Sequence, residues 1–276
     1  MRVGILADTH LRCTEVRRVA DAVARMSGLG AEIAVLAGDV GEGSAAFRRC
    51  LAVVRSRFGG DVLVLCGNHD LWNAPGYNRP ARGSRELWEE ILPRAMADAG
   101  CIDLERSVWR RGGLAVAGSI GWYDYSATPD RPPNPWAYYE VNKFRQSNDA
   151  DFIDWEFSDR QFAAEVGRGL VARLGRLELD PGTDAVLVAT HMPLFERQLA
   201  GGYDHTYWGN LTLGGEVSRF AKVRWVVSGH THAFARGAVP RAGGADMLVA
   251  TVPSDYGRPG FVVVDTEASA DAWFNT

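Results

Sequence analysis

Short, almost continuous runs of Val, Ile, Leu and Ala recur along the 276-residue chain and constrain its fold more than any other feature. The first three lie at 3–7, 33–37 and 62–66, and uninterrupted apolar character of this length is typical of strands buried on both faces. Amphipathic stretches of helical period separate them, at 14–27, with Thr14 as the expected N-cap, and at 44–57. The alternation predicts a layered α/β fold with parallel strands at its centre.

The later part of the chain continues with two further helices and then becomes strand-rich. One helix is expected at 84–99, bent at Pro93, and another at 158–174, where Ser158 and Gln161 form a capping box. Further apolar runs are found at 114–117, 185–189, 225–227, 247–250 and 261–264. No repeat of 20 to 50 residues is visible, which argues against a solenoid or propeller. We therefore expect a single domain over residues 1–276.

The stretch at about 121–157 differs from its surroundings because aromatic residues alternate there with prolines and acids. It is too aromatic for a disordered segment, so we expect an ordered insertion that serves either as a lid or as packing. Trp122 and Tyr123 follow a predicted strand and are candidate substrate contacts. His205 and Tyr207 lie in a loop-like stretch and are candidates of the same kind, with a solvated loop as the alternative.

Composition excludes several classes of protein. A formal net charge of −4 argues against a dedicated nucleic-acid binder. The four cysteines show no CxxC spacing, which favours reduced, buried thiols in a cytosolic protein. No apolar run reaches the roughly 20 residues that cross a bilayer, and the first residues do not resemble a secretory signal. These features predict a cytoplasmic protein without a membrane partner.

Polar residues that bind metals follow five of the apolar runs, at the point where each run ends. The segments are 8–10 (Asp-Thr-His), 38–39 (Gly-Asp), 67–70 (Gly-Asn-His-Asp), 190–191 (Thr-His) and 229–232 (Gly-His-Thr-His). Ligands of open α/β sheets bind at the carboxyl ends of the strands. Carboxylates, imidazoles and one amide form the nitrogen and oxygen set that suits Mn²⁺, Fe²⁺ or Zn²⁺. The sequence therefore predicts a site for such ions at the strand ends.

In order and spacing, these five segments resemble the motif blocks of the calcineurin-like metallophosphoesterase family. The resemblance implies a four-layer α/β/β/α sandwich with two mixed β-sheets and a dinuclear metal site at the strand ends. It assigns one ion to Asp8, His10, Asp39 and His232. It assigns the other to Asp39, Asn68, His191 and His230, with Asp39 bridging. His69 would be the catalytic proton donor, with Asp70 orienting its imidazole; Glu42 stands where many members carry an aspartate that is not a ligand.

The expected activity is hydrolysis of a phosphate ester. Two ions can activate a shared water for in-line attack on phosphorus, and His69 as imidazolium would protonate the leaving alkoxide. A small phosphomonoester is the leading substrate, because the chain is acidic and the insertion could restrict the cleft. The alternatives are a phosphodiesterase acting on cyclic nucleotides or nucleic acid, a serine/threonine protein phosphatase, and a non-catalytic binding scaffold. The sequence leaves the metal identity and the oligomeric state open.

Overall fold

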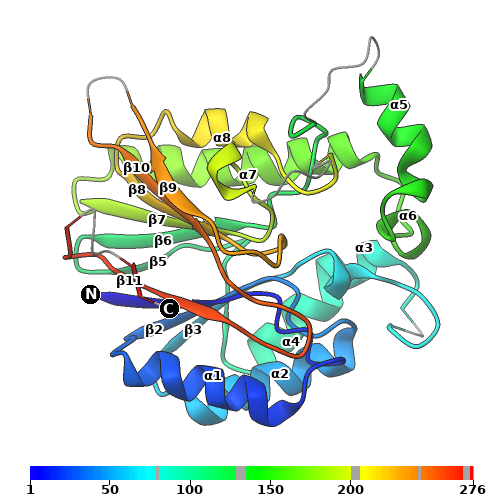
Figure 1. Ribbon diagram of the computed structural model, residues 1–276, viewed down its shortest axis with the longest axis horizontal. Coiled ribbons are helices and arrows are strands. Elements are labelled where there is room, and N and C mark those ends of the chain that lie inside the picture. Colours follow the sequence, from blue (N-terminus) through cyan, green and yellow to red (C-terminus); the bar gives the residue numbers. More distant parts are fainter. Residues whose placement is uncertain (79–80, 129–134, 200–205, 242–243, 270–273, 276) are drawn as a thin grey trace.

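The computed structural model describes the chain except for residues 79–80, 129–134, 200–205, 242–243, 270–273 and 276. Two six-stranded sheets pack face to face, and helices cover the outer face of each (Figure 1). The order of layers is α/β/β/α, which confirms the fold class that the sequence predicts. Among the described residues, no helix is both long and apolar enough to cross a membrane.

The first sheet is built around the N-terminal strand. Its strand order is β12 (Phe274–Asn275), β11 (Phe261–Asp265), β1 (Arg2–Leu6), β2 (Ile33–Ala37), β3 (Asp61–Leu65) and β4 (Ile102–Asp103). β1 runs parallel to β2 and antiparallel to β11, so the sheet is mixed. Its outer face is covered by α1 (Val16–Gly28), α2 (Ser44–Arg57) and α4 (Leu92–Asp98) (Figure 1).

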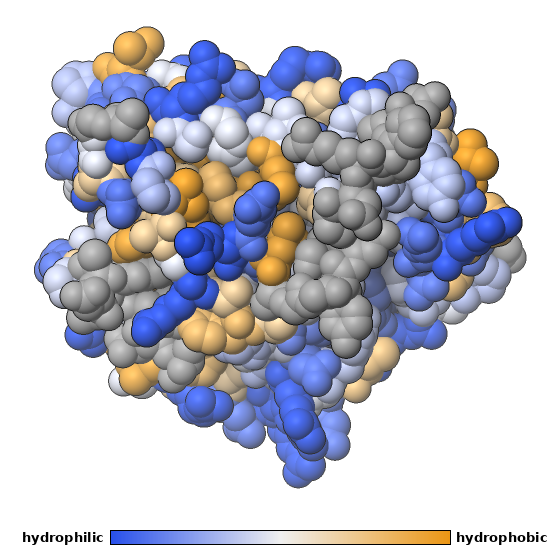
Figure 2. All heavy atoms as spheres, turned by 45° about the horizontal axis from the view of Figure 1, so that its top comes forward, coloured by the Kyte–Doolittle hydropathy of each residue, from blue (hydrophilic) through white to orange (hydrophobic). Residues whose placement is uncertain are grey.

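The second sheet has four parallel strands at its centre and an antiparallel strand at each edge. Its order is β5 (Trp109–Arg111), β6 (Leu114–Ser119), β7 (Ala185–Thr190), β8 (Val223–Ser228), β10 (Met247–Thr251) and β9 (Arg236–Val239). Helices α7 (Asp159–Leu179) and α8 (Leu211–Val217) cover its outer face. Seen from the side of these helices, the surface is mostly hydrophilic with small apolar patches (Figure 2).

Three apolar layers hold the sandwich together, and they explain why the strands carry no polar alternation. In β1, Ile5 points into the layer between the two sheets, whereas Leu6 points toward the helices on the outer face. A third layer lies between the second sheet and α7 and α8, where Val188 meets Leu174. Because both faces of the central strands are buried, successive residues must all be apolar.

Helix boundaries differ from the predicted ones where a side chain has another partner. The first helix begins at Val16, and the Thr14 hydroxyl accepts a hydrogen bond from the Gly257 N–H at 3.2 Å instead of capping the helix. The predicted bend near Pro93 takes the form of a π-helical turn, η2 (Leu87–Ile91), between α3 (Ser84–Glu86) and α4. The capping box at the start of α7 is confirmed, and α7 continues past the predicted end.

The aromatic insertion is ordered where it is described and folds into short helices. These are α5 (Pro135–Asn142), η3 (Lys143–Arg145) and α6 (Asp149–Phe152), which lie beside one end of the sandwich (Figure 1). Two further short 3-10 helices, η1 (His69–Leu71) and η4 (Glu196–Gln198), follow β3 and β7. A role of the insertion as a lid stays a prediction, as does the single-domain organisation.

Candidate metal centre

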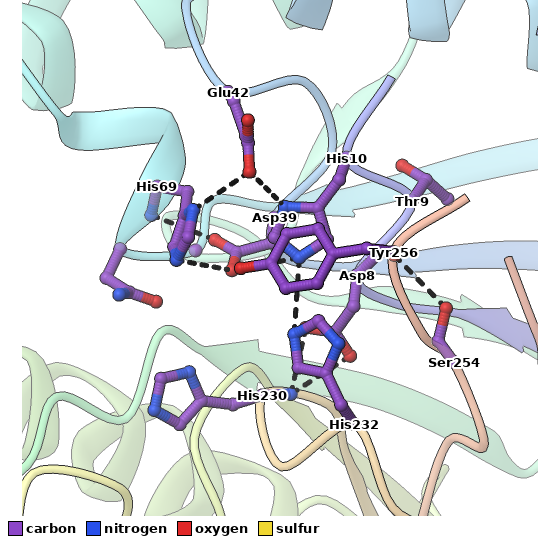
Figure 3. Close-up of polar contacts among 12 residues, drawn as sticks. Asp8, Thr9, His10, Asp39, Glu42, His69, His230, His232, Ser254 and Tyr256 are labelled. Atoms are coloured by element: carbon purple, nitrogen blue, oxygen red, sulfur yellow. Dashed lines mark hydrogen bonds and ion pairs between the residues drawn. The ribbon is translucent and has the colours of Figure 1, made fainter. Parts of the chain in front are cut away.

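The five polar segments converge at one edge of the sandwich, where β1, β2, β3, β7 and β8 end. Because these strands run parallel within each sheet, their carboxyl ends meet at the same edge. Figure 3 shows the side chains of Asp8, His10, Asp39 and His232 gathered at one place, with the ring of His230 to one side of them. The topology therefore brings together ligands that lie more than 200 residues apart in the sequence, such as His10 and His232, whose Nε2 atoms are 3.3 Å apart.

The backbone at this edge is strained at the candidate ligands themselves. Five of them have φ angles between 40° and 70°, namely Asp8, His10, Asp39, His230 and His232. Non-glycine residues rarely adopt this region, and each such residue costs on the order of 1–3 kcal/mol. Strain of this kind persists only where the surrounding structure imposes it, and it clusters at functional sites. The sharp turns aim these side chains back across the strand ends.

Two glycines allow the close packing of the site. At Gly38, where φ is 90°, a Cβ atom would lie 2.3 Å from Nδ1 of His191. At Gly67 it would lie 2.1 Å from Oδ1 of Asp39. Asp39 thus packs against the backbone after the neighbouring strand β3, and His191 packs against the backbone after a strand of the other sheet. Any side chain at these two glycine positions would displace the ligands.

The first group of ligand atoms comes from Asp8, His10 and His232, all within 4.8 Å of one another. Nε2 of His10 faces Nε2 of His232 at 3.3 Å, an approach that suits two lone pairs directed at one ion. The Asp8 carboxylate accepts a hydrogen bond from the His230 N–H at 3.0 Å. The Ser254 hydroxyl donates to the Asp8 carbonyl at 3.1 Å (Figure 3).

The second group comes from Asp39, His191 and His230, again within 4.8 Å. Nδ1 of His191 lies 3.0 Å from the Ala37 carbonyl oxygen, which can only accept, so this nitrogen carries the proton. Nε2 of His191 is therefore the nitrogen available to an ion, and it lies 3.0 Å from Oδ1 of Asn68. The ligand atoms predicted for the second ion, from Asp39, Asn68, His191 and His230, therefore lie close together.

Asp39 lies between the two groups, as a bridging carboxylate requires. Its Oδ1 is 3.5 Å from Nε2 of His191, and its Oδ2 is 3.7 Å from Nε2 of His10. The side chain is 1% exposed, yet Oδ2 has no hydrogen-bond partner among the described residues. A buried carboxylate oxygen without a donor is costly, and a cation between the two groups would satisfy it. The donor set therefore fits a pair of divalent ions.

The negative charge of Asp39 dominates the electrostatics of the site. Burial lowers the pKa of His191, but the Asp39 carboxylate outweighs burial and raises the pKa to about 9. Burial and the neighbouring His191 hold the pKa of His230 well below its usual range. Burial opposes ionisation of Asp39, but the surrounding histidines outweigh it and hold its pKa well below the usual value. Negative charge therefore concentrates on the carboxylate that a cation would contact.

His69 is held by Glu42 and not by Asp70, which corrects the sequence prediction. Nδ1 of His69 lies 3.0 Å from Oε1 of Glu42, and the same oxygen lies 2.8 Å from Nδ1 of His10 (Figure 3). The Asp70 carboxylate instead accepts hydrogen bonds from four backbone N–H groups, those of Val40, Gly41, Glu42 and Gly67. Asp70 therefore shapes the loop after β2, and Glu42 sets the orientation of the His69 ring.

The predicted substrate contacts at Trp122 and Tyr123 are also corrected. Both side chains are 0% exposed and pack in the core beneath the insertion. Their polar atoms donate to buried carboxylates, Trp122 Nε1 to Asp159 at 2.8 Å and the Tyr123 hydroxyl to Asp149 at 3.0 Å. Neither ring can reach a cleft, because the chain enters an aromatic core directly after β6 and both residues are buried there.

The remaining two candidates have different outcomes. Tyr207 is buried, and its hydroxyl donates to the Tyr139 carbonyl at 2.9 Å, so its side chain is part of the core. Its own carbonyl oxygen lies 3.4 Å from Nε2 of His230, so it meets the site through its backbone. His205 lies outside the described residues.

Sequence reasoning missed three residues that border the site. Tyr256 is 49% exposed, and its ring centroid lies 4.4 Å from that of His10 and 4.8 Å from that of His232. Trp72 stacks on His69 with ring centroids 3.6 Å apart. Asp149, from the insertion, accepts a hydrogen bond from Asn68 Nδ2 at 2.9 Å. Trp72 stands two residues beyond the third segment, and that nearness is the only sequence signal for any of the three.

The four layers and the clustered carboxylate and imidazole ligands at the strand ends define a metallohydrolase. The sequence model of the family described as "Calcineurin-like phosphoesterase" matches residues 1–234, so the chain belongs to this family. It is accordingly a metal-dependent phosphoesterase, of a family that typically binds two metal ions. A comparison with curated protein sequences gives no match.

Solved structures with the same fold include a hydrolase and a phosphatase. A phosphopantetheinyl hydrolase from Mycobacterium tuberculosis is 20% identical with a TM-score of 0.75, and the match covers 97% of each chain. A dimetal phosphatase from Danio rerio is 14% identical with a TM-score of 0.56, over 95% of this chain and 91% of that one. At these identities the likeness concerns the fold.

Proposed function

We propose that this protein hydrolyses small phosphate esters with two divalent ions held by the two ligand groups, Mn²⁺, Fe²⁺ or Zn²⁺ being the ions that suit the donors. One ion would be held by Asp8, His10, Asp39 and His232, and the other by Asp39, Asn68, His191 and His230. The observation that carries the proposal is the position of Asp39, whose two carboxylate oxygens face a histidine of each group.

The ions, when bound, supply the positive charge that clamps the phosphate oxygens and activates a water for attack. His69 supplies the proton for the leaving oxygen. Nδ1 of His69 is hydrogen-bonded to Glu42. Nε2 is therefore directed toward the metal centre, where it lies 3.9 Å from Oδ2 of Asp39. Trp72 stacks on the imidazole and fixes its tilt. A donor held on two sides is positioned for general acid catalysis.

We infer that Tyr256 makes the kind of substrate contact that the sequence predicts for Trp122 and Tyr123. Its ring lies across His10 and His232, and its hydroxyl end is directed toward His69 and Asp39 (Figure 3). Since the ring is half exposed, a substrate that reaches the ions would pass along it. We infer that Tyr256 contacts the part of the ester next to phosphorus.

A phosphomonoester is the leading substrate and a phosphodiester is the second candidate. The acidic, compact chain and the insertion beside the site favour a small monoester. One observation favours the diester. No lysine or arginine in the described part of the chain forms an ion pair with the site carboxylates, whereas Glu42 adds a negative charge beside His10 and His69. A diester carries one negative charge near neutrality and needs less neutralisation than a monoester.

The general-acid role is tested by replacing His69. In His69→Asn, we expect both ions to stay bound, because His69 belongs to neither ligand group. Turnover of an alkyl phosphate should fall by about 10²–10⁴-fold, the usual contribution of positioned proton transfer. Turnover of the matching p-nitrophenyl ester should fall much less, because that leaving group departs without a proton. Equal turnover by variant and wild type on both esters would contradict the assignment.

The substrate class is tested by a panel of metal-reconstituted reactions. Paired alkyl and p-nitrophenyl monoesters and diesters separate the two candidates, and a phosphopantetheinyl ester joins the panel because a phosphopantetheinyl hydrolase shares the fold. We expect the higher kcat/KM on a monoester. A negligible monoester rate beside a robust diester rate would overturn the leading choice, and inactivity on every ester with both ions bound would overturn hydrolysis itself.

A further inference from the structure

We propose that Asp149, which the insertion contributes through α6, positions the metal ligand Asn68 and so makes the insertion part of the metal centre. The inference rests on the proposed function, because it takes Asn68 as a ligand of the second ion. Asp149 is not adjacent in sequence to any ligand segment. It is brought to the site only by the fold of the insertion.

The contacts of Asp149 are those of a fully engaged buried carboxylate. The side chain is 2% exposed. Its Oδ1 accepts hydrogen bonds from Asn68 Nδ2 at 2.9 Å and from Trp72 Nε1 at 2.7 Å. Its Oδ2 accepts one from the Tyr123 hydroxyl at 3.0 Å. A buried charge needs such donors to offset the loss of water.

The bond to Asn68 decides which end of its amide faces the ions. A side-chain amide has an oxygen that can bind a cation and an NH₂ group that cannot. Because a carboxylate only accepts hydrogen bonds, Asp149 must face the NH₂ end. The oxygen then points the other way, where it lies 3.0 Å from Nε2 of His191. Without Asp149, the amide is free to turn its NH₂ end toward the ion.

The same carboxylate also supports the proton donor. Trp72 donates its Nε1 to Asp149 and stacks on the His69 ring with an interplanar angle of 25°. One side chain of the insertion therefore sets the orientation of a ligand and of the ring beneath the general acid. Asp149 touches neither substrate nor ions, so it is a positioning residue.

A second aspartate of the insertion provides a matched control. Asp154 accepts hydrogen bonds from the Ser84 N–H at 2.7 Å and from Asn73 Nδ2 at 2.9 Å. It thus ties the end of the same insertion to the core without contacting a ligand. Loss of Asp154 loosens the attachment of the insertion, whereas loss of Asp149 should also release Asn68.

The test is a Mn²⁺ titration of the full chain, followed by electron paramagnetic resonance and calorimetry. Wild type should bind two ions. In Asp149→Ala, the Kd of one site should rise by about 10–100-fold, the usual effect of removing a partner that orients a metal ligand. The other site should be unchanged. Asp154→Ala should bind both ions as wild type does. Asp149→Asn should retain both, because its amide oxygen can still accept from Asn68 and Trp72 while its NH₂ group donates to the Tyr123 oxygen.

Four outcomes would overturn the inference. They are unchanged affinity at both sites in Asp149→Ala, an equal loss in Asp154→Ala, an equal loss of both sites in Asp149→Ala, and a loss in Asp149→Asn as large as in the alanine variant. If Asp149→Ala does not fold, Asp149→Ser is titrated in its place, since its hydroxyl is too short to reach Asn68. Fewer than two ions in wild type would instead contradict the proposed function, so the two failures are distinguishable.

Discussion

Replacement of Glu42 by glutamine removes the negative charge that holds His69 while keeping the shape of the side chain. Glu42 is 4% exposed, and Oε1 lies 3.0 Å from Nδ1 of His69 and 2.8 Å from Nδ1 of His10. Burial raises the pKa of this carboxyl, but the adjacent imidazoles of His10 and His69 outweigh burial and hold the pKa far below its usual range. The group is thus ionised beside the proton donor.

The size of the expected loss depends on the strength of this contact. A hydrogen bond to a charged group contributes about 1.5–3 kcal/mol. If the His69 imidazolium loses that support in the transition state, the rate falls by about 10- to 150-fold, since 1.4 kcal/mol corresponds to a factor of ten. The metal affinity should fall as well, because Glu42 also contacts His10, and the assay therefore uses saturating metal.

The assay compares kcat of Glu42→Gln on an alkyl phosphate and on a p-nitrophenyl ester. The alkyl rate should show the full loss, and the p-nitrophenyl rate a much smaller one. Asp70→Asn is the comparison, because Asp70 does not contact His69 and holds the loop after β2 through its backbone N–H groups, that of Glu42 included. Losing two of its four hydrogen bonds should lower the free energy of unfolding by about 3–6 kcal/mol. Unchanged rates in Glu42→Gln, or an equal loss on both esters, would refute the reasoning.

Three further changes test other parts of the molecule. Gly38→Ala places a Cβ atom 2.3 Å from Nδ1 of His191, so metal analysis should show one ion lost, and retention of both ions would contradict the close packing. Tyr256→Ala should raise KM by about 2- to 12-fold, the range of an aromatic contact, with metal content unchanged; an unaltered KM would remove Tyr256 from the substrate path. Burial raises the pKa of Glu105 to about 7. Folded Glu105 therefore binds its proton more tightly than the unfolded chain does, and stability should fall by on the order of 3 kcal/mol as pH rises from about 4.3 to 7. Urea unfolding of Glu105→Gln should show a loss of unfolding free energy between these pH values that is smaller by about 3 kcal/mol than in wild type. The same pH dependence in variant and wild type would contradict the raised pKa of Glu105.

The strand ends and their ligands could be predicted from the sequence because both signals are local. Buried parallel strands are visible as short apolar runs, and parallel pairing alone brings the residues after each run to one edge. Asp8, His10 and Asp39 could therefore be placed together with His191 and His232 from the sequence alone.

The partners of the ligands could not be predicted in the same way. Whether Glu42 or Asp70 meets His69 depends on a loop in which Asp39 and Glu42 both have positive φ, and spacing does not reveal that turn. Asp149 reaches Asn68 across 81 positions of sequence through an irregular insertion. These contacts depend on tertiary packing, about which periodicity and motif spacing carry no information.

The burial of the aromatic residues after β6 could not be predicted from the sequence either. Trp122 and Tyr123 follow a strand end, which favours a cleft, but Asp159 and Asp149 accept their polar hydrogens inside the core. When a buried carboxylate accepts the polar hydrogen of a Trp or Tyr, the whole ring can be buried, and the residue then stabilises the core and does not contact a ligand. The sequence does not say which carboxylates are buried.

The number of ions that the two ligand groups hold is the quantity on which the bridged metal centre depends most directly. A Mn²⁺ titration of wild type and Asp39→Asn, with bound metal counted per chain, measures that number. We predict two ions for wild type, and in Asp39→Asn the loss of tight binding at both sites, because the two groups share Asp39. A wild-type protein that binds a single ion, or an Asp39→Asn variant that binds two as tightly as wild type, would contradict the bridged centre.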